Sequence, residues 1–249
     1  MKKTIALISV LLFAPILFAA QECPGKQVPF SLVNNNGGAA KSFDVNADGV
    51  PEKFFMCQSS KEKNKTLFRI LDGKTNEIIA SVILDINPTN LEDEAADISL
   101  VQSLHLDERA DSWYQIYASP DFKKAFSYLA VDFSAGVLSD VRHSHNLFFQ
   151  KGKFIGMIKT KDNSGGGERS NFDYEKIIPV KFPKYKDIPA LAVYGVKQSL
   201  VNPFDGFYTN FSEKLLRLYV LENGMLKQIY KTGDSEDSLT DLYSSDDAD

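Results

Sequence analysis

The residues best suited to chemistry stand in one short stretch, DVNADGVPE, which covers residues 44–52. Oxygen-bearing side chains occur at every second position, followed by a glycine and a further carboxylate. Hard cations such as calcium prefer six to eight oxygen ligands, and alternate residues of a tight loop can supply them. The spacing therefore predicts a calcium loop. The expected ligands are the side chains of Asp44, Asn46, Asp48 and Glu52 and the backbone carbonyl of Val50.

The alternative is a polar turn, in which the Asp and Asn side chains accept hydrogen bonds from nearby backbone N–H groups. Three alternating oxygen ligands, Gly49 and a fourth acid exceed what a turn requires, so the pattern favours cation binding. Most loops of this kind fix the entry into a strand. We therefore expect a structural ion rather than a catalytic one, because no base or nucleophile is tied to the loop.

The residues after the loop exclude the helical calcium folds. An EF-hand needs a bidentate Glu at the twelfth position and a helix on each side. The twelfth position here is Phe55, within the run KFFMC, which is typical of a strand. The loop resembles instead the DxDxDGxxD calcium loop of the FG-GAP and VCBS repeats in integrin-like β-propellers, which also leads directly into a strand.

This resemblance covers residues 42–85, because the segment RILDGKTNEIIAS resembles the outer hairpin of a propeller blade. The chain departs from the motif in three ways: Asn at the third position, Glu at the ninth, and a single copy of the loop. The resemblance implies a structural calcium ion within a propeller-like β fold.

Alternating apolar and polar residues around tight-turn dipeptides predict a mainly β chain. Residues 112–119 and 189–196 add runs rich in aromatic and β-branched side chains. Several hairpins in series indicate an antiparallel meander, arranged as a propeller-like fold, a barrel or a sandwich, with one or two short helices. The turn dipeptides are Asp72-Gly73, Lys151-Gly152 and Asn223-Gly224.

Helical signals are few. Ser119 and Pro120 are typical of a helix start, and residues 90–106 fit either a capped helix or an acidic loop followed by a strand. No linker divides the chain. We expect a signal peptide at 1–20, one β-rich domain at 21–232 and a disordered acidic tail at 233–249.

The first twenty residues have the basic, apolar and small-residue parts of a secretory signal. Cys23 comes too late after the expected cut to carry a lipid anchor. A periplasmic or secreted protein without a membrane anchor is therefore predicted. The formal charge of −5 becomes −7 without Lys2 and Lys3, so the composition shows no electrostatic footprint for nucleic acid.

The two cysteines, Cys23 and Cys57, lie on either side of the acidic loop. In an oxidising compartment two cysteines are most simply one disulfide, which here would enclose the loop. Two unpaired thiols are the alternative.

Other candidate sites have weaker patterns. Asp140, His143 and His145 have a spacing that suits zinc or copper if residues 141–149 form a strand, but a strand or turn without metal is favoured. His105 lies between two leucines and is interpreted as structural. Residues 162–168 lack the spacing of a phosphate-binding loop and indicate a surface loop.

A good structural-metal loop without a catalytic constellation favours a protein that binds another macromolecule. In size, compartment and calcium loop, the chain is similar in kind to periplasmic inhibitors of lysozyme-like hydrolases and to immunity proteins against secreted wall-degrading toxins. That similarity implies a periplasmic hydrolase or toxin as the partner, contacted through residues 161–171 or 202–212.

The main alternative is an enzyme, an envelope-acting hydrolase with acidic residues at its active site. A surface adhesion module is a third class, and the single calcium loop disfavours it. The acidic residues considered for hydrolysis are Glu92, Asp93, Glu94, Asp107 and Glu108, and the aromatic residues considered for a binding surface are Phe204, Phe207, Tyr208 and Phe211.

Overall fold

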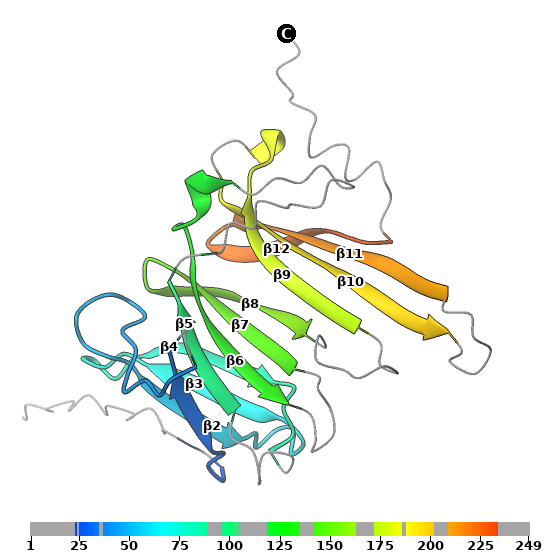
Figure 1. The fold of residues 1–249 in the computed structure, drawn as a ribbon. Helices are drawn as coiled ribbons and strands as arrows, with labels where there is room; N and C mark the ends of the chain where they lie inside the picture. The colour runs from blue at the N-terminus through cyan, green and yellow to red at the C-terminus, as the bar shows by residue number, and fades with distance from the viewer. Residues whose placement is uncertain are drawn as a thin grey trace, which may run out of the picture.

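The computed structural model shows a chain of β-strands arranged in two sheets (Figure 1). The predicted signal segment lies outside the part that is described, as do residues 112–118 of the strand predicted at 112–119 and residues 234–249 of the tail predicted at 233–249. The structure describes residues 23, 25–34, 37–88, 96–102, 104, 119–134, 142–162, 172–185, 188–201 and 209–233.

A small antiparallel sheet directly follows the acidic loop. Its strands are β2 (Lys53–Gln58), β3 (Thr66–Leu71) and β4 (Ile78–Leu84), in the order β2-β3-β4. The turn after Asp72 joins β3 to β4, as the sequence predicts. The outer edge of β2 is covered in part by the N-terminal segment, because Gln27 pairs with Cys57.

The second sheet has nine strands in the order β1-β5-β6-β7-β8-β9-β10-β11-β12. All pairs are antiparallel except β1 with β5, which is parallel. The predicted hairpins around Lys151-Gly152 and Asn223-Gly224 are confirmed as β7–β8 and β11–β12. The strands are β1 (Phe30–Val33), β5 (Ala96–Val101), β6 (Ser127–Ser134), β7 (Arg142–Gln150), β8 (Lys153–Asp162), β9 (Phe172–Val180), β10 (Ala190–Val201), β11 (Thr209–Glu222) and β12 (Met225–Lys231).

The small sheet packs face to face against β5–β8. Alternate residues of each strand point to one face, so a single apolar set from each sheet can meet in a common core. This core also takes in Phe43 and Val45 from the acidic loop. From the two sheets it contains Met56, Phe68, Ile70, Ala80, Leu84, Ala96, Ile98, Leu129, Val131, Leu147 and Phe149.

The nine-stranded sheet bends where β8 meets β9. These two strands share one pairing, Asp162 with Tyr174, and then separate. The inside of the bend is filled by Phe148 and Ile158 from one half and by Leu191, Val193 and Tyr219 from the other. The opposite face of β5–β8 therefore packs on β10–β12, which gives three stacked layers of strand.

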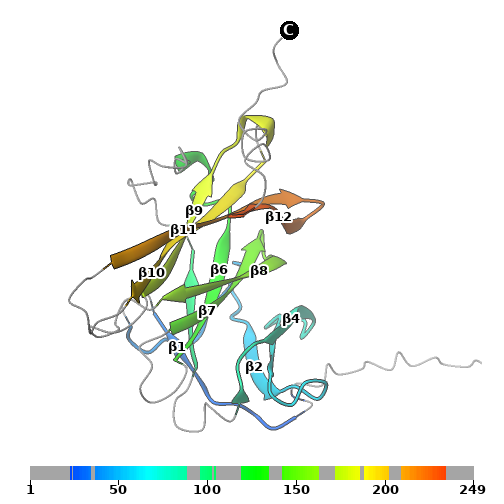
Figure 2. The same cartoon turned by 90° about the vertical axis from the view of Figure 1, so that its right-hand side faces the viewer.

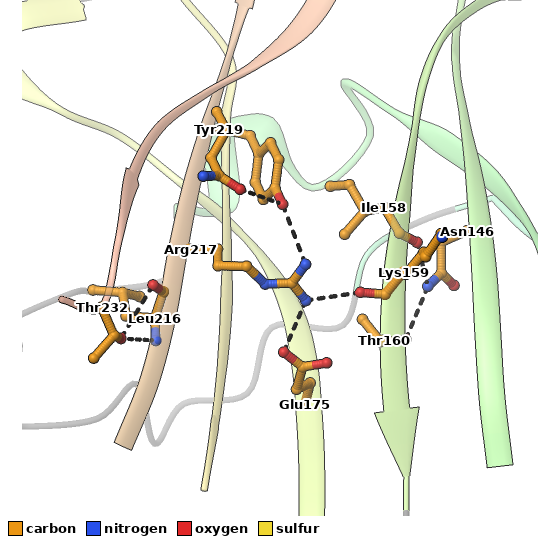
Figure 3. Close-up of polar contacts among 10 residues, drawn as sticks. Asn146, Ile158, Lys159, Thr160, Glu175, Leu216, Arg217, Tyr219 and Thr232 are labelled. Atoms are coloured by element: carbon orange, nitrogen blue, oxygen red, sulfur yellow. Dashed lines mark hydrogen bonds and ion pairs between the residues drawn. The ribbon is translucent and has the colours of Figure 1, made fainter. Parts of the chain in front are cut away.

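One arginine joins the two halves at the bend (Figure 3). Arg217 on β11 donates from Nη2 to the backbone carbonyl of Lys159 on β8 at 2.7 Å and to the carboxylate of Glu175 on β9 at 2.8 Å. Its Nη1 reaches the hydroxyl of Tyr219 at 3.3 Å. Arg217 thus supplies a donor to β8 where the sheet hydrogen bonds to β9 are lost.

Helical structure in the described residues is confined to short 3₁₀ segments. The helix expected after Ser119 is one of them, η2 (Pro120–Phe122), and Ser119 makes no side-chain cap. It ends early because Phe126 is buried in the bend of the sheet and β6 begins at Ser127. The other is η3 (Pro183–Tyr185). Of the two interpretations of residues 90–106, the strand is confirmed as β5.

The prediction of a mainly β, antiparallel fold is confirmed. Among the arrangements left open by the sequence, stacked sheets of the sandwich kind describe the structure, and the strand order does not close into a barrel. Within the described part, no helix has the length and apolar character needed to cross a membrane.

The connections β6–β7, β8–β9 and β10–β11 leave the nine-stranded sheet at one end. The strands alternate in direction, so every second connection is on the same side. These strand ends extend from the lower centre to the right of Figure 1 and lie toward the left of Figure 2. The pairs Ser134–Arg142 and Val201–Thr209 mark this end. The connecting segments, 135–141, 163–171 and 202–208, lie outside the described residues.

The Arg217 contact generates a stability prediction. Replacing Arg217 by Met removes the donor to the Lys159 carbonyl and the ion pair to Glu175, whose side chain is only 13% exposed. We expect the free energy of unfolding to fall by about 2 kcal/mol, because a largely buried carboxylate loses its charged partner.

Urea denaturation measures this loss, with Lys227→Met as the control. The Lys227–Glu222 pair is about half exposed on both sides, so its removal should lower the free energy of unfolding much less than Arg217→Met does. Equal effects of the two substitutions would show that the Arg217 contact contributes no more than a surface ion pair.

Candidate functional site

The acidic loop runs along the junction between the two sheets. Its early residues alternate in burial: Phe43 and Val45 are buried in the common core, whereas Asp44 and Asn46 are partly exposed. This period of two is that of an extended chain, so the oxygen-bearing side chains share the outer side. The backbone N–H of Glu52 donates to the carbonyl of Phe43 at 2.9 Å and closes the loop at its base.

Within the loop, three oxygen-bearing side chains accept hydrogen bonds from backbone N–H groups. Asp44 accepts from Asp48 at 3.1 Å and from Gly49 at 2.9 Å, and the Oδ1 of Asn46 also accepts from Asp48 at 2.9 Å. Asp48 accepts from Val50 at 2.8 Å. Gly49 has a φ of +88°, the left-handed conformation that lets the chain turn at the glycine.

The last acid of the motif, Glu52, is turned into the protein. It is 5% exposed, and its Oε2 accepts from the backbone N–H of Val45 at 2.6 Å. Its other oxygen, Oε1, is buried without a hydrogen-bond partner. Burial raises the pKa of Glu52, and the negative charge of Asp44 adds to that rise, while backbone N–H groups of Val45, Glu52 and Asn46 act in the opposite direction.

These residues fit an oxygen-loving cation in their chemistry. An ionised carboxylate offers about four acceptor sites, so the loop's internal hydrogen bonds leave Asp44 and Asp48 with lone pairs to spare. Among the described residues no lysine or arginine forms an ion pair with Asp44, Asp48 or Glu52. These three acids, of which Glu52 has one buried oxygen without a hydrogen-bond partner, therefore lack a positive partner within that part of the chain.

The arrangement of the acids differs from a ready-made ligand cage. In the described ranges no three His, Cys, Asp or Glu side chains converge on a point that could hold a metal ion. Val50 is 37% exposed and contributes its N–H to the loop. Binding through all five expected ligands therefore requires side chains to move, with Glu52 turning away from Val45.

Two residues beside the loop were not expected from the sequence. Asp72, at the turn after β3, accepts from the side-chain amide of Asn46 at 3.0 Å. Gly152, in the β7–β8 turn, lies so close to Asn46 that an added Cβ would be 2.7 Å from the Asn46 Cβ. The dipeptides Asp72-Gly73 and Lys151-Gly152 signal turns, but nothing local indicates that both turns reach residue 46.

The predicted disulfide between Cys23 and Cys57 is present. The two Cα atoms are 5.8 Å apart, within the range of ordinary disulfides. Cys57 lies on β2 and is fully buried. The bridge therefore ties the N-terminal segment to the strand that follows the acidic loop.

The two histidines of the weaker candidate share one face of β7. The ring of Phe133 stacks on both His143 and His145, at centroid distances of 5.3 and 5.7 Å. His145 is 2% exposed, its Nε2 accepts from the backbone N–H of Asp85 at 3.2 Å, and its Nδ1 is buried without a partner. Packing and a backbone hydrogen bond thus account for His145. Asp140 and His105 lie outside the described residues.

An acidic pair that the sequence did not single out lies on β5 and β6. Asp97 and Asp132 are opposite each other in the register of these strands, and Asp132 accepts a hydrogen bond from the hydroxyl of Ser144 on β7. Like charges directly opposite on neighbouring strands are unfavourable, so a carboxylate pair there is notable. The acids considered earlier, at 92–94 and 107–108, lie outside the described residues.

Comparison with known proteins adds no relative. No protein-family model matches the chain, and neither the curated proteins nor the solved structures give a significant match.

The environment of His145 generates a pH prediction. Burial, with a smaller effect from His143, lowers the pKa of His145 to about 4, below the value of about 6.5 for an exposed histidine. Between these pH values the unfolded chain binds the proton and the folded protein does not. The titration of His145 therefore leaves the free energy of unfolding unchanged above pH 6.5. On acidification toward pH 4 it lowers that free energy by about 3 kcal/mol in total.

The variant His145→Gln keeps an acceptor for the Asp85 N–H but does not titrate in this range. The free energy of unfolding, measured by urea denaturation from pH 7 to pH 4, should fall more steeply for the natural protein than for this variant. Carboxylate contributions are common to both proteins and cancel in the difference. Parallel curves would contradict the assignment of the slope to His145.

Proposed function

We propose that this chain is an exported, calcium-stabilised β protein that acts by binding another protein, with a periplasmic cell-wall hydrolase or toxin as the partner class. The observation that carries the binding role is the common end of the nine-stranded sheet, where β6–β7, β8–β9 and β10–β11 are connected. Segments that leave one end of a rigid sheet are the usual position of binding loops. The segments expected to contact a partner, 161–171 and 202–212, both begin or end there.

The two ends of the sheet differ in their connections. At the opposite end, the tight turns Lys151-Gly152 and Asn223-Gly224 join β7–β8 and β11–β12, and the longer segments 102–126 and 181–189 join β5–β6 and β9–β10. At the common end all three connections have seven to nine residues. In this proposal the strands supply the stable support that an inhibitor of a hydrolase needs, and these connections supply its contacts with the enzyme.

In this proposal the cation stabilises the sheets that carry the binding segments. The acidic loop enters β2 directly, and Phe43 and Val45 anchor it in the core between the sheets. Calcium suits the oxygen-only set of Asp44, Asn46, Asp48 and Glu52 better than magnesium, which demands a stricter octahedral geometry. The ion would balance acids that have no positive partner among the described residues, and its role is structural.

One observation favours the alternative of an envelope hydrolase. Asp97 and Asp132 are direct neighbours across β5 and β6, and hydrolysis of glycosidic bonds commonly uses two carboxylates at short separation. In that function Asp132, held by Ser144, would be one of the acting acids.

The calcium site is tested by thermal unfolding with calcium and with a chelator. Calcium at 100-fold above its dissociation constant should stabilise the folded protein by about 2.7 kcal/mol, which raises the Tm by several degrees. Asp48→Ala should abolish the calcium-dependent rise, whatever its effect in chelator. Asp121→Ala, at an exposed acid far from the loop in sequence, is the control and should keep the rise. An unchanged Tm for the natural protein would remove the calcium site.

The binding role is tested by adding the purified protein to purified muramidases, amidases and endopeptidases acting on cell wall. We expect stoichiometric inhibition of one class, and the unfolded, reduced protein as control should leave all three unaffected. Cleavage of the wall by the protein alone, lost in Asp132→Asn, would establish the hydrolase instead. If the protein inhibits none of these enzymes and does not cleave the wall itself, the proposed partner class is wrong.

A further inference from the structure

Two turns, β3–β4 of the small sheet and β7–β8 of the nine-stranded sheet, lie in close contact with different residues of the acidic loop. In the small sheet, Gly73 at the β3–β4 turn faces Pro51, and an added Cβ would lie 2.0 Å from the Pro51 carbonyl oxygen. In the nine-stranded sheet, an added Cβ at Gly152 would lie 2.7 Å from the Cβ of Asn46 and 3.0 Å from its Cα. Both distances are too short for any side chain, so each turn meets the loop through a glycine.

Polar contacts join the same three parts. The amide of Asn46 donates to Asp72 beside Gly73, while the backbone of Asn46 meets Gly152. One residue of the loop, Asn46, therefore touches both the small sheet and the nine-stranded sheet, and it is also one of the expected ligands. Any change in the position of Asn46 is transmitted to both turns.

The inner side of the loop has a second feature that points to an ion. Glu52 is 95% buried by the loop and the core, with one oxygen that lacks a partner. A buried polar atom without a partner is costly, and a cation drawn to the loop would relieve that cost. The loop thus has acids without a positive partner among the described residues and close contacts with a turn of each sheet.

We propose that the acidic loop couples ion binding to the docking of the two sheets: calcium held by the loop fixes Asn46 against Gly152 and Asp72, and the docked sheets in turn hold the backbone of the loop in place while its side chains turn toward the ion. This inference rests on the calcium site proposed above and adds its partners, the β3–β4 and β7–β8 turns. By thermodynamic linkage, a change that loosens the contact of either turn with the loop must lower the affinity for calcium. Bound calcium must in turn favour the docked sheets by the same factor.

The chain offers a matched pair of substitutions for the test. Gly152 and Gly224 each follow a left-handed residue in a tight hairpin turn, with φ of +76° and +77°. Alanine therefore adds the same backbone strain at both positions. At 152 the new methyl group meets Asn46, whereas at 224 nothing lies within 4 Å.

Isothermal titration with calcium chloride measures the affinity of the natural protein, Gly152→Ala and Gly224→Ala. Couplings between sites are commonly worth about 5- to 150-fold, so we expect Gly152→Ala to bind calcium roughly ten-fold more weakly. Gly224→Ala should bind within two-fold of the natural protein. Equal affinities in all three proteins, or an equal loss in both variants, would overturn the coupling while leaving the calcium site intact. Absence of calcium binding by the natural protein would overturn the site itself.

Hydrogen exchange of the natural protein supplies a second measurement, which does not depend on a variant folding. Calcium should slow amide exchange about ten-fold in β3 and β4 and at residues 151–152, which are not expected ligands. Strands β10 and β11, whose described buried residues lie in other clusters than Phe43 and Val45, are the internal control and should change little. Uniform slowing across all strands, or slowing confined to residues 44–52, would overturn the coupling.

Discussion

The burial of Phe43 and Val45 is the constraint on which the junction of the two sheets depends. These side chains enter the core that the small sheet shares with β5–β8, and their spacing forces Asp44 and Asn46 to the outer side. The acids are thus arranged by an apolar contact. The hydrogen bond from the backbone N–H of Glu52 to the carbonyl of Phe43 then sets the length of the loop and the point at which β2 begins.

Two ion pairs of the described residues lie at joins between layers. Arg217 spans the bend between β8 and β9, and the ion pair of Asp85 with Lys159 links the end of β4 to β8. Such pairs contribute little when exposed and more when partly buried, so the Arg217 pair is expected to stabilise its join more than the half-exposed Asp85–Lys159 pair does. The apolar clusters supply most of the stability, because burial scales with area and does not depend on direction.

Local patterns were enough to predict the hairpins. The β3–β4, β7–β8 and β11–β12 hairpins each carry a glycine in their turn with alternating residues around it, and that information lies within about 20 residues of chain. The disulfide followed from the count of cysteines. The acidic loop was recognised for the same reason, because all its oxygen-bearing residues are close in sequence.

The bend, the parallel pair of β1 with β5, and the neighbours of the loop were beyond that reach. Arg217 meets Lys159 and Glu175 across 58 and 42 positions, and no local pattern marks such a contact. Glu52 was expected to point toward the other acids, but its inward orientation depends on how well the surrounding core accepts a carboxylate. The roles of Asp72 and Gly152 depend on which turn lies beside which loop, a property of the folded sheets.

The parallel pairing of β1 and β5 has a consequence for how the chain folds. Residues 34–95 leave the nine-stranded sheet at β1 and return to the adjacent position at β5, so the loop, the small sheet and its hairpin form one long excursion. Most other strands pair with a neighbour in sequence and can assemble by local hairpin closure, which is fast. Joining β1 to β5 requires closure of a loop of about 60 residues, and the conformational entropy lost in that step is offset only once the segment between the two strands has packed. We therefore expect β6–β12 to form early, with the N-terminal strand added last.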